Sequence, residues 1–146
     1  MPETDIGRLL LEAHRALGDE FVDELNERGY EDVRPGHSAV CMNIDRRSGT
    51  GLSELARRAR ITKQGMMLLV DELESRGYVR RVPDPSDARA KTVKLTARGR
   101  RYVAEARRVV AGIESRLRRE LGTKRYAELR GSLEWVAGLE DDQPTS

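Results

Sequence analysis

The stretch from Leu52 to Gly99 constrains the fold of this chain more than any other part of it. It contains two short helical patterns separated by a few residues, then a basic hairpin pattern and the start of another helix. Two helices joined by a turn of three or four residues meet at a steep angle, so the second can lie in a DNA major groove while the first crosses the backbone. The sequence therefore predicts a winged helix-turn-helix, a mainly α fold with a minor β component in a two-stranded wing.

Capping residues mark the two helices. Ser53 can cap the first, because its hydroxyl can accept a hydrogen bond from a free backbone N–H. Thr62 can cap the second, and apolar residues then recur at helical spacing until Gly77 offers a stop, which predicts a helix over about 63–76. Arg60 lies in the turn where many such motifs have glycine, so either Arg60 adopts a left-handed backbone or the turn differs.

After these helices, two segments alternate β-branched or aromatic residues with basic ones, as strands do: YVRRV and AKTVKL. The segment PDPSDAR between them is rich in turn-forming residues. We predict a hairpin with a charged tip. The alternative is that this hairpin is only a surface ribbon whose charges are solvated.

The net charge of +2 conceals an uneven distribution. Residues 1–45 carry a net charge of −7, residues 46–108 carry +10, and residues 109–146 carry −1. The sign changes at the boundaries of the motif, and such a concentration of positive charge is typical of a surface that binds nucleic-acid phosphates. An ordinary solvated face is the alternative.

Long amphipathic helices flank the motif. A helix over about 5–28 has an apolar stripe that is too long to be covered by the winged helix-turn-helix alone. A helix of about 25 residues follows Thr96, and Gly122 and Thr123 separate it from a last helix with its own stripe. These stripes predict a further packing partner, although packing within one monomer is the simpler alternative.

Length and composition fit one domain, 1–146, because 146 residues with 38% hydrophobic content supply a modest core. No apolar run approaches the roughly 20 residues that cross a bilayer, and a secretion signal is not evident, so we expect a cytoplasmic protein without a membrane partner. The one cysteine, Cys41, fits a reducing compartment. Without a phosphate loop, nucleophile motif or metal-ligand cluster, neither an enzyme nor a cofactor or metal is expected.

Five segments carry a resemblance to a known family: LSELA, TKQ, LVDELESRGYV, DPSDAR and KLTARG. Together they resemble the MarR-type regulators of bacteria and archaea, which are dimeric winged-helix DNA-binding proteins. The resemblance implies a winged helix-turn-helix over about 35–96, and dimerisation helices over about 5–34 and 97–139 that interlock with a second subunit. A two-fold dimer predicts a roughly palindromic operator with half-sites about one DNA turn apart.

The start of the second helix is expected to read DNA bases. The Gln64 amide can both donate and accept, which matches the N6 and N7 edge of adenine. Lys63 can reach a guanine or a phosphate, and Gly65 lets the backbone approach the groove. Leu68, if it projects outward, can touch a thymine methyl, and packing against the hairpin is its alternative role. Family members often have small hydroxyl residues and an arginine here, whereas this chain has Gly65, Met67 and Leu68, so base contacts do not carry over from the resemblance.

In the hairpin, Arg89 is the candidate for insertion into a narrow minor groove, whose negative potential attracts guanidinium groups. Asp87 lies two residues earlier, and the DxR wing motif of the family supports a short ion pair that steadies Arg89. Further phosphate contacts are expected from Arg57, Thr62, Arg80, Arg81 and Lys91.

The resemblance also implies a repressor controlled by a small effector, often an aromatic or phenolic anion, bound between the dimer helices and the winged head. His14, His37 and Cys41 are the candidate pocket residues. For His37, local capping or a buried hydrogen bond is the competing role. Cys41 invites a redox-sensor hypothesis, but it lies among apolar helical residues where thiols are commonly inert. A winged helix that binds only protein is the remaining alternative, and its binding would lack the salt dependence of DNA binding.

Overall fold

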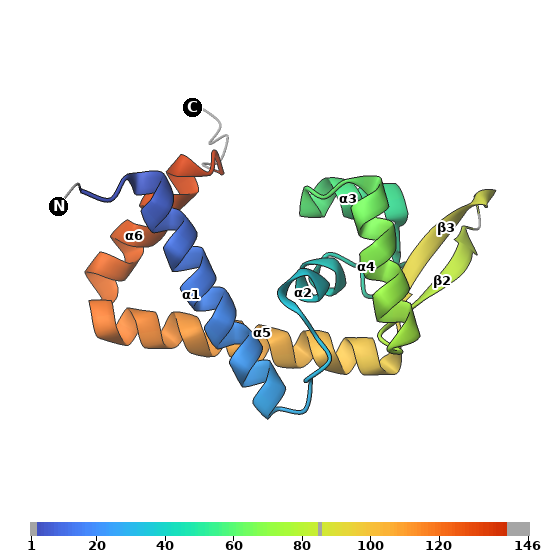
Figure 1. The fold of residues 1–146 in the computed structure, drawn as a ribbon, viewed down its shortest axis with the longest axis horizontal. Helices are drawn as coiled ribbons and strands as arrows, with labels where there is room; N and C mark the ends of the chain where they lie inside the picture. Colours follow the sequence, from blue (N-terminus) through green and yellow to red (C-terminus); the bar gives the residue numbers. More distant parts are fainter. Residues whose placement is uncertain (1–2, 85, 140–146) are drawn as a thin grey trace, which may run out of the picture. The chain divides into compact units, whose positions relative to one another are not determined.

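The computed structural model describes residues 3–84 and 86–139. The chain divides within its fifth helix into two compact units, the first reaching Val109 and the second starting at Val110. In chain order the elements are α1 (Ile6–Glu27), α2 (Pro35–Met42), β1 (Thr50–Gly51), α3 (Leu52–Ala59), α4 (Lys63–Ser75), β2 (Val79–Asp84), β3 (Asp87–Leu95), α5 (Ala97–Leu121) and α6 (Thr123–Val136) (Figure 1). This order confirms the mainly α fold with a small antiparallel sheet.

Capping side chains set the starts of two helices, and the sequence predicted one of them, Thr62. The Asp5 carboxylate accepts a hydrogen bond from the Arg8 N–H at 2.9 Å and begins α1. The Thr62 hydroxyl accepts a hydrogen bond from the Gly65 N–H at 3.1 Å and begins α4. Each bond satisfies one of the N–H groups that a helix start leaves without an intrahelical partner.

The helix α3 starts differently from the prediction and ends as expected. The prediction that Ser53 caps this helix is wrong, because α3 begins at Leu52 and its N-cap is Gly51, which has no capping side chain. At the other end Arg60 has φ 55° and ψ 43°, which is the left-handed conformation considered for this turn. The steep turn between α3 and α4 is therefore made without glycine.

The sheet has three antiparallel strands in the order β1-β3-β2. The sequence predicted only the β2–β3 hairpin, because β1 has two residues and is too short for an alternating pattern. The strand β3 begins at Asp87, earlier than predicted, so Arg89 lies in the strand and not in a loop. Pro85, in the expected turn, lies outside the described residues.

The reading head, which we define as residues 35–96, is built around one face of α4. Met66, Val70 and Leu73 recur at helical spacing on that face and are fully buried. Leu55 of α3 and Val93 of β3 are also fully buried, and α4 contacts α2, α3 and β2. Burial of each such side chain stabilises the fold by roughly 1.5–3 kcal/mol. Figure 1 shows α2, α3 and the hairpin around α4, and Met67 and Leu68 on its other face are exposed.

Three tyrosines connect the reading head to the adjoining helices of the first unit. The rings of Tyr30 and Tyr102 lie 5.3 Å apart and those of Tyr78 and Tyr102 lie 5.4 Å apart, both edge to face. This is a favoured geometry for aromatic rings. Tyr30 follows α1, Tyr78 precedes β2 and Tyr102 lies in α5, so the cluster fixes the base of the wing against both helices.

The helices α1 and α6 leave large apolar side chains exposed at several positions. In α1 of the first unit, Ile6 is 71% exposed and Leu9 is 52% exposed. In α6 of the second unit, Trp135 is 67% exposed and Val136 is 58% exposed. These are helices that the sequence assigned to dimerisation, and the dimer and the domain limits stay predictions. None of the helices in the described residues combines the length and apolar character needed to cross a membrane.

Candidate nucleic-acid interface

The first two residues of α4 have exposed side chains, whereas Met66 of the same turn is buried. Lys63 and Gln64 are exposed, and within residues 3–84 and 86–139 neither makes a side-chain hydrogen bond or ion pair. Leu68 is 65% exposed and Met67 is 44% exposed, and no other large apolar side chain in the described part of the reading head is as exposed. Leu68 therefore projects outward, which argues against its packing on the hairpin.

Gly65 has a local reason to be glycine. A Cβ at this position would lie 3.0 Å from Cγ2 of Ile61 and 3.1 Å from the hydroxyl oxygen of Thr62. Both separations are tighter than ordinary van der Waals contact, so packing at the helix start already disfavours a side chain. The close approach of Gly65 to a DNA groove stays a prediction.

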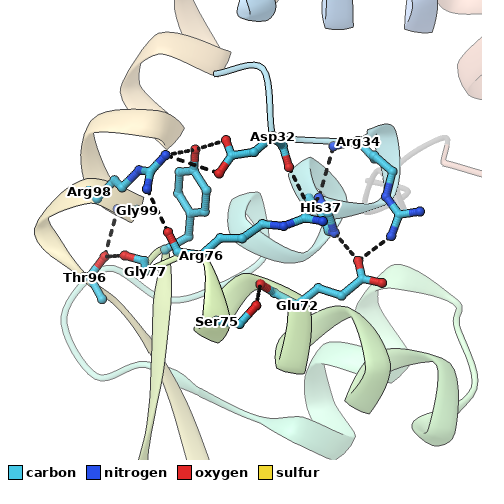
Figure 2. Close-up of polar contacts among 11 residues, drawn as sticks. Asp32, Arg34, His37, Glu72, Ser75, Arg76, Gly77, Thr96, Arg98 and Gly99 are labelled. Atoms are coloured by element: carbon cyan, nitrogen blue, oxygen red, sulfur yellow. Dashed lines mark hydrogen bonds and ion pairs between the residues drawn. The ribbon is translucent and has the colours of Figure 1, made fainter. Parts of the chain in front are cut away.

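The last turns of α4 are held by a network of polar contacts, drawn in Figure 2. His37 Nδ1 accepts a hydrogen bond from the Arg34 N–H at 3.0 Å. Its Nε2 therefore carries the ring proton and donates to Glu72 Oε2 at 2.6 Å. The ring is fully buried. These contacts give His37 the capping and buried hydrogen-bonding role that competed with a place in an effector pocket.

Glu72 connects α4 to the start of α2. Besides the His37 ring, its carboxylate accepts a hydrogen bond from the Arg34 guanidinium at 2.5 Å. The hydrogen bonds from Arg34 and then His37 lower the pKa of the Glu72 carboxyl from 4.5 to about 2. The ionised carboxylate is therefore the form that the folded protein stabilises.

The same network continues around Asp32, in the segment before α2. The Tyr78 hydroxyl donates to Asp32 Oδ1 at 2.8 Å, and Arg76 donates to the Asp32 carbonyl at 2.5 Å. Arg98 of α5 donates to the Arg76 carbonyl at 2.8 Å and lies 4.4 Å from the centre of the Tyr78 ring. Burial, followed by the bond to Asp32, raises the pKa of Tyr78 to about 12. The end of α4 is thus joined to α5 and to the segment before α2 (Figure 2).

Contacts at the start of α5 explain why the KLTARG segment has threonine at position 96 and glycine at position 99. The Thr96 hydroxyl donates to the Gly77 carbonyl at 2.6 Å and accepts a hydrogen bond from the Gly99 N–H at 3.1 Å (Figure 2). A Cβ on Gly99 would lie 2.0 Å from the carbonyl oxygen of Tyr78. A side chain at this position is therefore incompatible with the observed backbone.

The wing presents cations that are available for DNA. Arg80, Arg89 and Lys91 are exposed, and none has a carboxylate partner among the described side chains. The expected ion pair of the DxR motif is replaced by another contact, because the Asp87 carboxylate accepts a hydrogen bond from the Arg89 backbone N–H at 3.0 Å. Asp87 therefore shapes the strand and leaves the guanidinium free. Thr62 is exposed, and its hydroxyl hydrogen remains available while its oxygen caps α4.

Two predicted phosphate contacts already have carboxylate partners. Arg57 donates to both oxygens of Glu54, at 2.9 and 2.5 Å. Arg81 donates to Asp71 at 2.6 Å and to Glu74 at 3.1 Å. A phosphate that bound either guanidinium would have to compete with these ion pairs.

The three candidate pocket residues do not share one environment. His14 is exposed on α1, whereas His37 and Cys41 are fully buried in α2. Burial raises the pKa of the Cys41 thiol to about 12, which disfavours the reactive thiolate. An effector could reach His37 or Cys41 only after a change in the surrounding structure.

The sequence did not identify the residues that hold α4. Asp32, Arg34, Glu72 and Arg76 come from segments far apart in the chain, and helical periodicity contains no information on their pairing. One usable signal was present. The helix α4 has three acidic residues in a segment expected to approach DNA, and each needs a cation to balance it.

Comparisons with known proteins agree with this geometry. The model of the MarR family matches residues 32–90. The chain is 34% identical over 96 residues to the HTH-type transcriptional repressor Rv2887 of Mycobacterium tuberculosis, covering 65% of this chain and 69% of that protein.

Solved structures are similar over almost the whole chain. The transcriptional repressor CouR bound to a 23-mer DNA duplex is 27% identical, with a TM-score of 0.78 over 91% of this chain and 92% of CouR. CouR from Rhodococcus jostii RHA1 bound to p-coumaroyl-CoA is 27% identical, with a TM-score of 0.71 over 97% of this chain and 94% of that chain. Sequence, fold and family match agree, and the chain belongs to the MarR family of winged helix-turn-helix transcriptional regulators.

Proposed function

We propose that this protein is a sequence-specific DNA-binding repressor that acts as a homodimer in the cytoplasm and releases its operator when a small molecule binds. The observation that carries the proposal is the exposed surface at the start of α4, where Lys63 and Gln64 have no side-chain partner among the described residues and Leu68 projects outward. The DNA complex of CouR supports the choice of DNA as the partner.

The reading surface divides into base and phosphate contacts, because these tasks need different chemistry. Gln64 is proposed to pair with adenine in the major groove, and Leu68 to contact a thymine methyl. Arg89 is proposed to enter the minor groove, where its free guanidinium meets the enhanced negative potential. Arg80 and Lys91 are proposed phosphate contacts, because both are exposed and neither has a carboxylate partner among the residues that the structure describes.

A homodimer gives the exposed apolar side chains of α1 and α6 a partner. Ile6 and Trp135 are each more than three-fifths exposed, a state that burial against a second subunit would relieve. A two-fold dimer places two reading heads symmetrically, so the operator is roughly palindromic with half-sites about one turn of DNA apart.

The proposed effector is a small aromatic or phenolic compound. The complex of CouR with p-coumaroyl-CoA supports this chemical class. Such a ligand releases DNA only if it binds the two spacings of the reading heads with unequal affinity. Of the three candidate residues, exposed His14 is the one that we retain for this contact.

The test is selection of bound fragments from random duplex DNA by the purified full chain, followed by titration over a range of salt. The expected result is an enriched near-palindrome whose affinity falls linearly with salt on a log–log plot, as released counterions require. Binding to DNA that is absent even at low salt would favour a protein-binding winged helix instead.

Arg89→Ala tests the wing within the same assay. We expect affinity to fall about tenfold or more, because a guanidinium in a narrow minor groove is lost. The control is Arg125→Ala, which removes an exposed arginine from α6, outside the reading head. Equal titration curves for wild type and Arg89→Ala would contradict the wing assignment.

A redox switch at Cys41 receives no support from its surroundings, since burial disfavours the thiolate. We expect a thiol reagent to modify Cys41 only at the rate of unfolding. The measurement is the modification rate over increasing urea, and rapid modification of the fully folded protein would restore the redox hypothesis.

A further inference from the structure

Arg81 joins the wing to the recognition helix α4. Its guanidinium donates to Asp71 Oδ1 at 2.6 Å and to Glu74 Oε1 at 3.1 Å, and its backbone N–H donates to Glu74 Oε2 at 2.9 Å. The Arg81 side chain is 22% exposed. Asp71 and Glu74 are three residues apart and share one side of α4, so a single residue of β2 binds both carboxylates.

The charge of α4 shows what this contact supplies. Between Lys63 and Ser75 the helix has one basic and three acidic residues, a net charge of −2. Glu72 is balanced by Arg34, whereas Asp71 and Glu74 share Arg81, which offsets one of their two negative charges. Without Arg81, the full negative charge of both carboxylates would oppose the entry of α4 into a groove lined by phosphates.

We propose that Arg81 is a positioning residue for DNA recognition and not a phosphate contact. Together with Arg34 it offsets the net charge of α4, and it fixes the wing against that helix, so that Gln64 and Arg89 reach their two grooves in one register. This inference rests on the proposed DNA-binding function. It replaces the phosphate contact that the sequence predicted for Arg81.

Arg80 provides a matched control, because it is the preceding residue of β2, has the same charge and is exposed, with no carboxylate partner in the described part of the chain. The full chain and its R80Q and R81Q variants are titrated with the selected operator and with a random duplex of equal length at several salt concentrations. R80Q should weaken both DNAs to a similar extent and reduce the log–log salt slope by about 0.9, the value for one phosphate.

R81Q should behave differently on both readouts. We expect about a tenfold loss or more for the selected operator, a much smaller loss for the random duplex, and an unchanged salt slope. Circular dichroism checks that the variant is folded. A slope reduced as in R80Q, with equal losses on both DNAs, would overturn the inference.

If R81Q does not fold, Arg81→Lys distinguishes a positioning role from a phosphate contact. Lysine keeps the positive charge but lacks the planar fork that reaches two carboxylates at once. Positioning predicts that Arg81→Lys loses selectivity for the operator by about fivefold or more, whereas a phosphate contact predicts affinity near that of wild type.

A paired substitution, Asp71→Asn with Glu74→Gln, gives an independent measure of coupling. If Arg81 acts through these carboxylates, the pair should tighten operator binding more in the R81Q background than in wild type. The same factor in both backgrounds would overturn the inference. If the wild-type chain binds neither DNA, the proposed function fails together with the inference; if it binds and the Arg81 variants match R80Q, only the inference fails.

Discussion

The two ends of α4 differ in how they are connected to the rest of the protein. At the first turn, Lys63 and Gln64 are exposed and have no side-chain partners among the described residues. From Asp71 to Arg76, side chains bind arginines, a histidine and a carbonyl that lie outside the helix. The helix is therefore fixed at the end remote from the first turn, and the exposed side chains of the first turn are free to bind.

This difference explains how a recognition helix can be rigid and available at once. Polar side chains that are bonded internally would lose those bonds on meeting DNA, and the loss would reduce affinity. Contacts at the last turns of α4 would not have to be broken when its first turn meets DNA. They hold the helix axis, whose direction decides where Gln64 and Leu68 would meet the bases in the proposed DNA complex.

The largest expected effect is on stability. It tests the held end of α4, by which we mean residues 71–76 and the contacts that they make outside the helix. His37→Ala removes a fully buried ring that caps α2 and binds Glu72, so we expect the free energy of unfolding to fall by about 3 kcal/mol. The measurement is urea unfolding of the full chain. Gln64→Ala at the free end is the matched comparison and should change stability by less than about 0.5 kcal/mol. Similar losses for the two variants would break the distinction between the ends.

The second prediction concerns the free end and DNA affinity. Replacing thymine by deoxyuridine in the selected operator removes methyl groups, and each methyl buried against Leu68 should contribute about 0.8 kcal/mol, or about fourfold in affinity. Leu68→Ala should bind the two DNAs equally. The measurement is a titration of both proteins with both duplexes. A wild-type protein indifferent to the methyl groups would remove Leu68 from the reading surface.

The smallest expected effect is a pH dependence at the held end. The Glu72 pKa is lowered from 4.5 to about 2 in the folded protein, so its contribution to stability is complete above about pH 4.5 and disappears as the pH falls toward 2. In Glu72→Gln this contribution is absent. The difference in unfolding free energy between wild type and variant should therefore be constant near neutral pH and narrow between pH 4.5 and 2. A difference that persists unchanged at pH 2 would contradict this role.

Local chemistry made the limits of α4 predictable, whereas its attachments were not. Thr62 as a cap and Gly77 as a stop predicted a helix over about 63–76, and the structure has Lys63–Ser75. Arg98 and Asp32 are 66 positions apart, and their pairing depends on tertiary structure alone. Arg81 was expected to bind phosphate because a basic residue on a wing usually does. Its carboxylate partners, Asp71 and Glu74, are present in the sequence, but the sequence does not show that they lie within hydrogen-bonding distance of Arg81.

In the wing motif, the sequence also failed to predict a contact between residues that are close together in the chain. The sequence placed Asp87 and Arg89 together and expected their charges to pair. The carboxylate instead binds the Arg89 backbone N–H. A side chain can satisfy a nearby backbone donor without restricting its neighbour's side chain, and spacing of two residues does not distinguish these outcomes.

The absence of internal partners at Lys63 and Gln64 within the described chain also bears on how such a protein can change over generations. Substitutions there do not disturb the buried core or the contacts that hold α4, so the cost in folding is small. Under the proposed function, a gene copy can therefore acquire a new operator through a few substitutions at exposed residues, while selection on the fold acts on other positions. Specificity and stability would then be inherited through separate sets of residues.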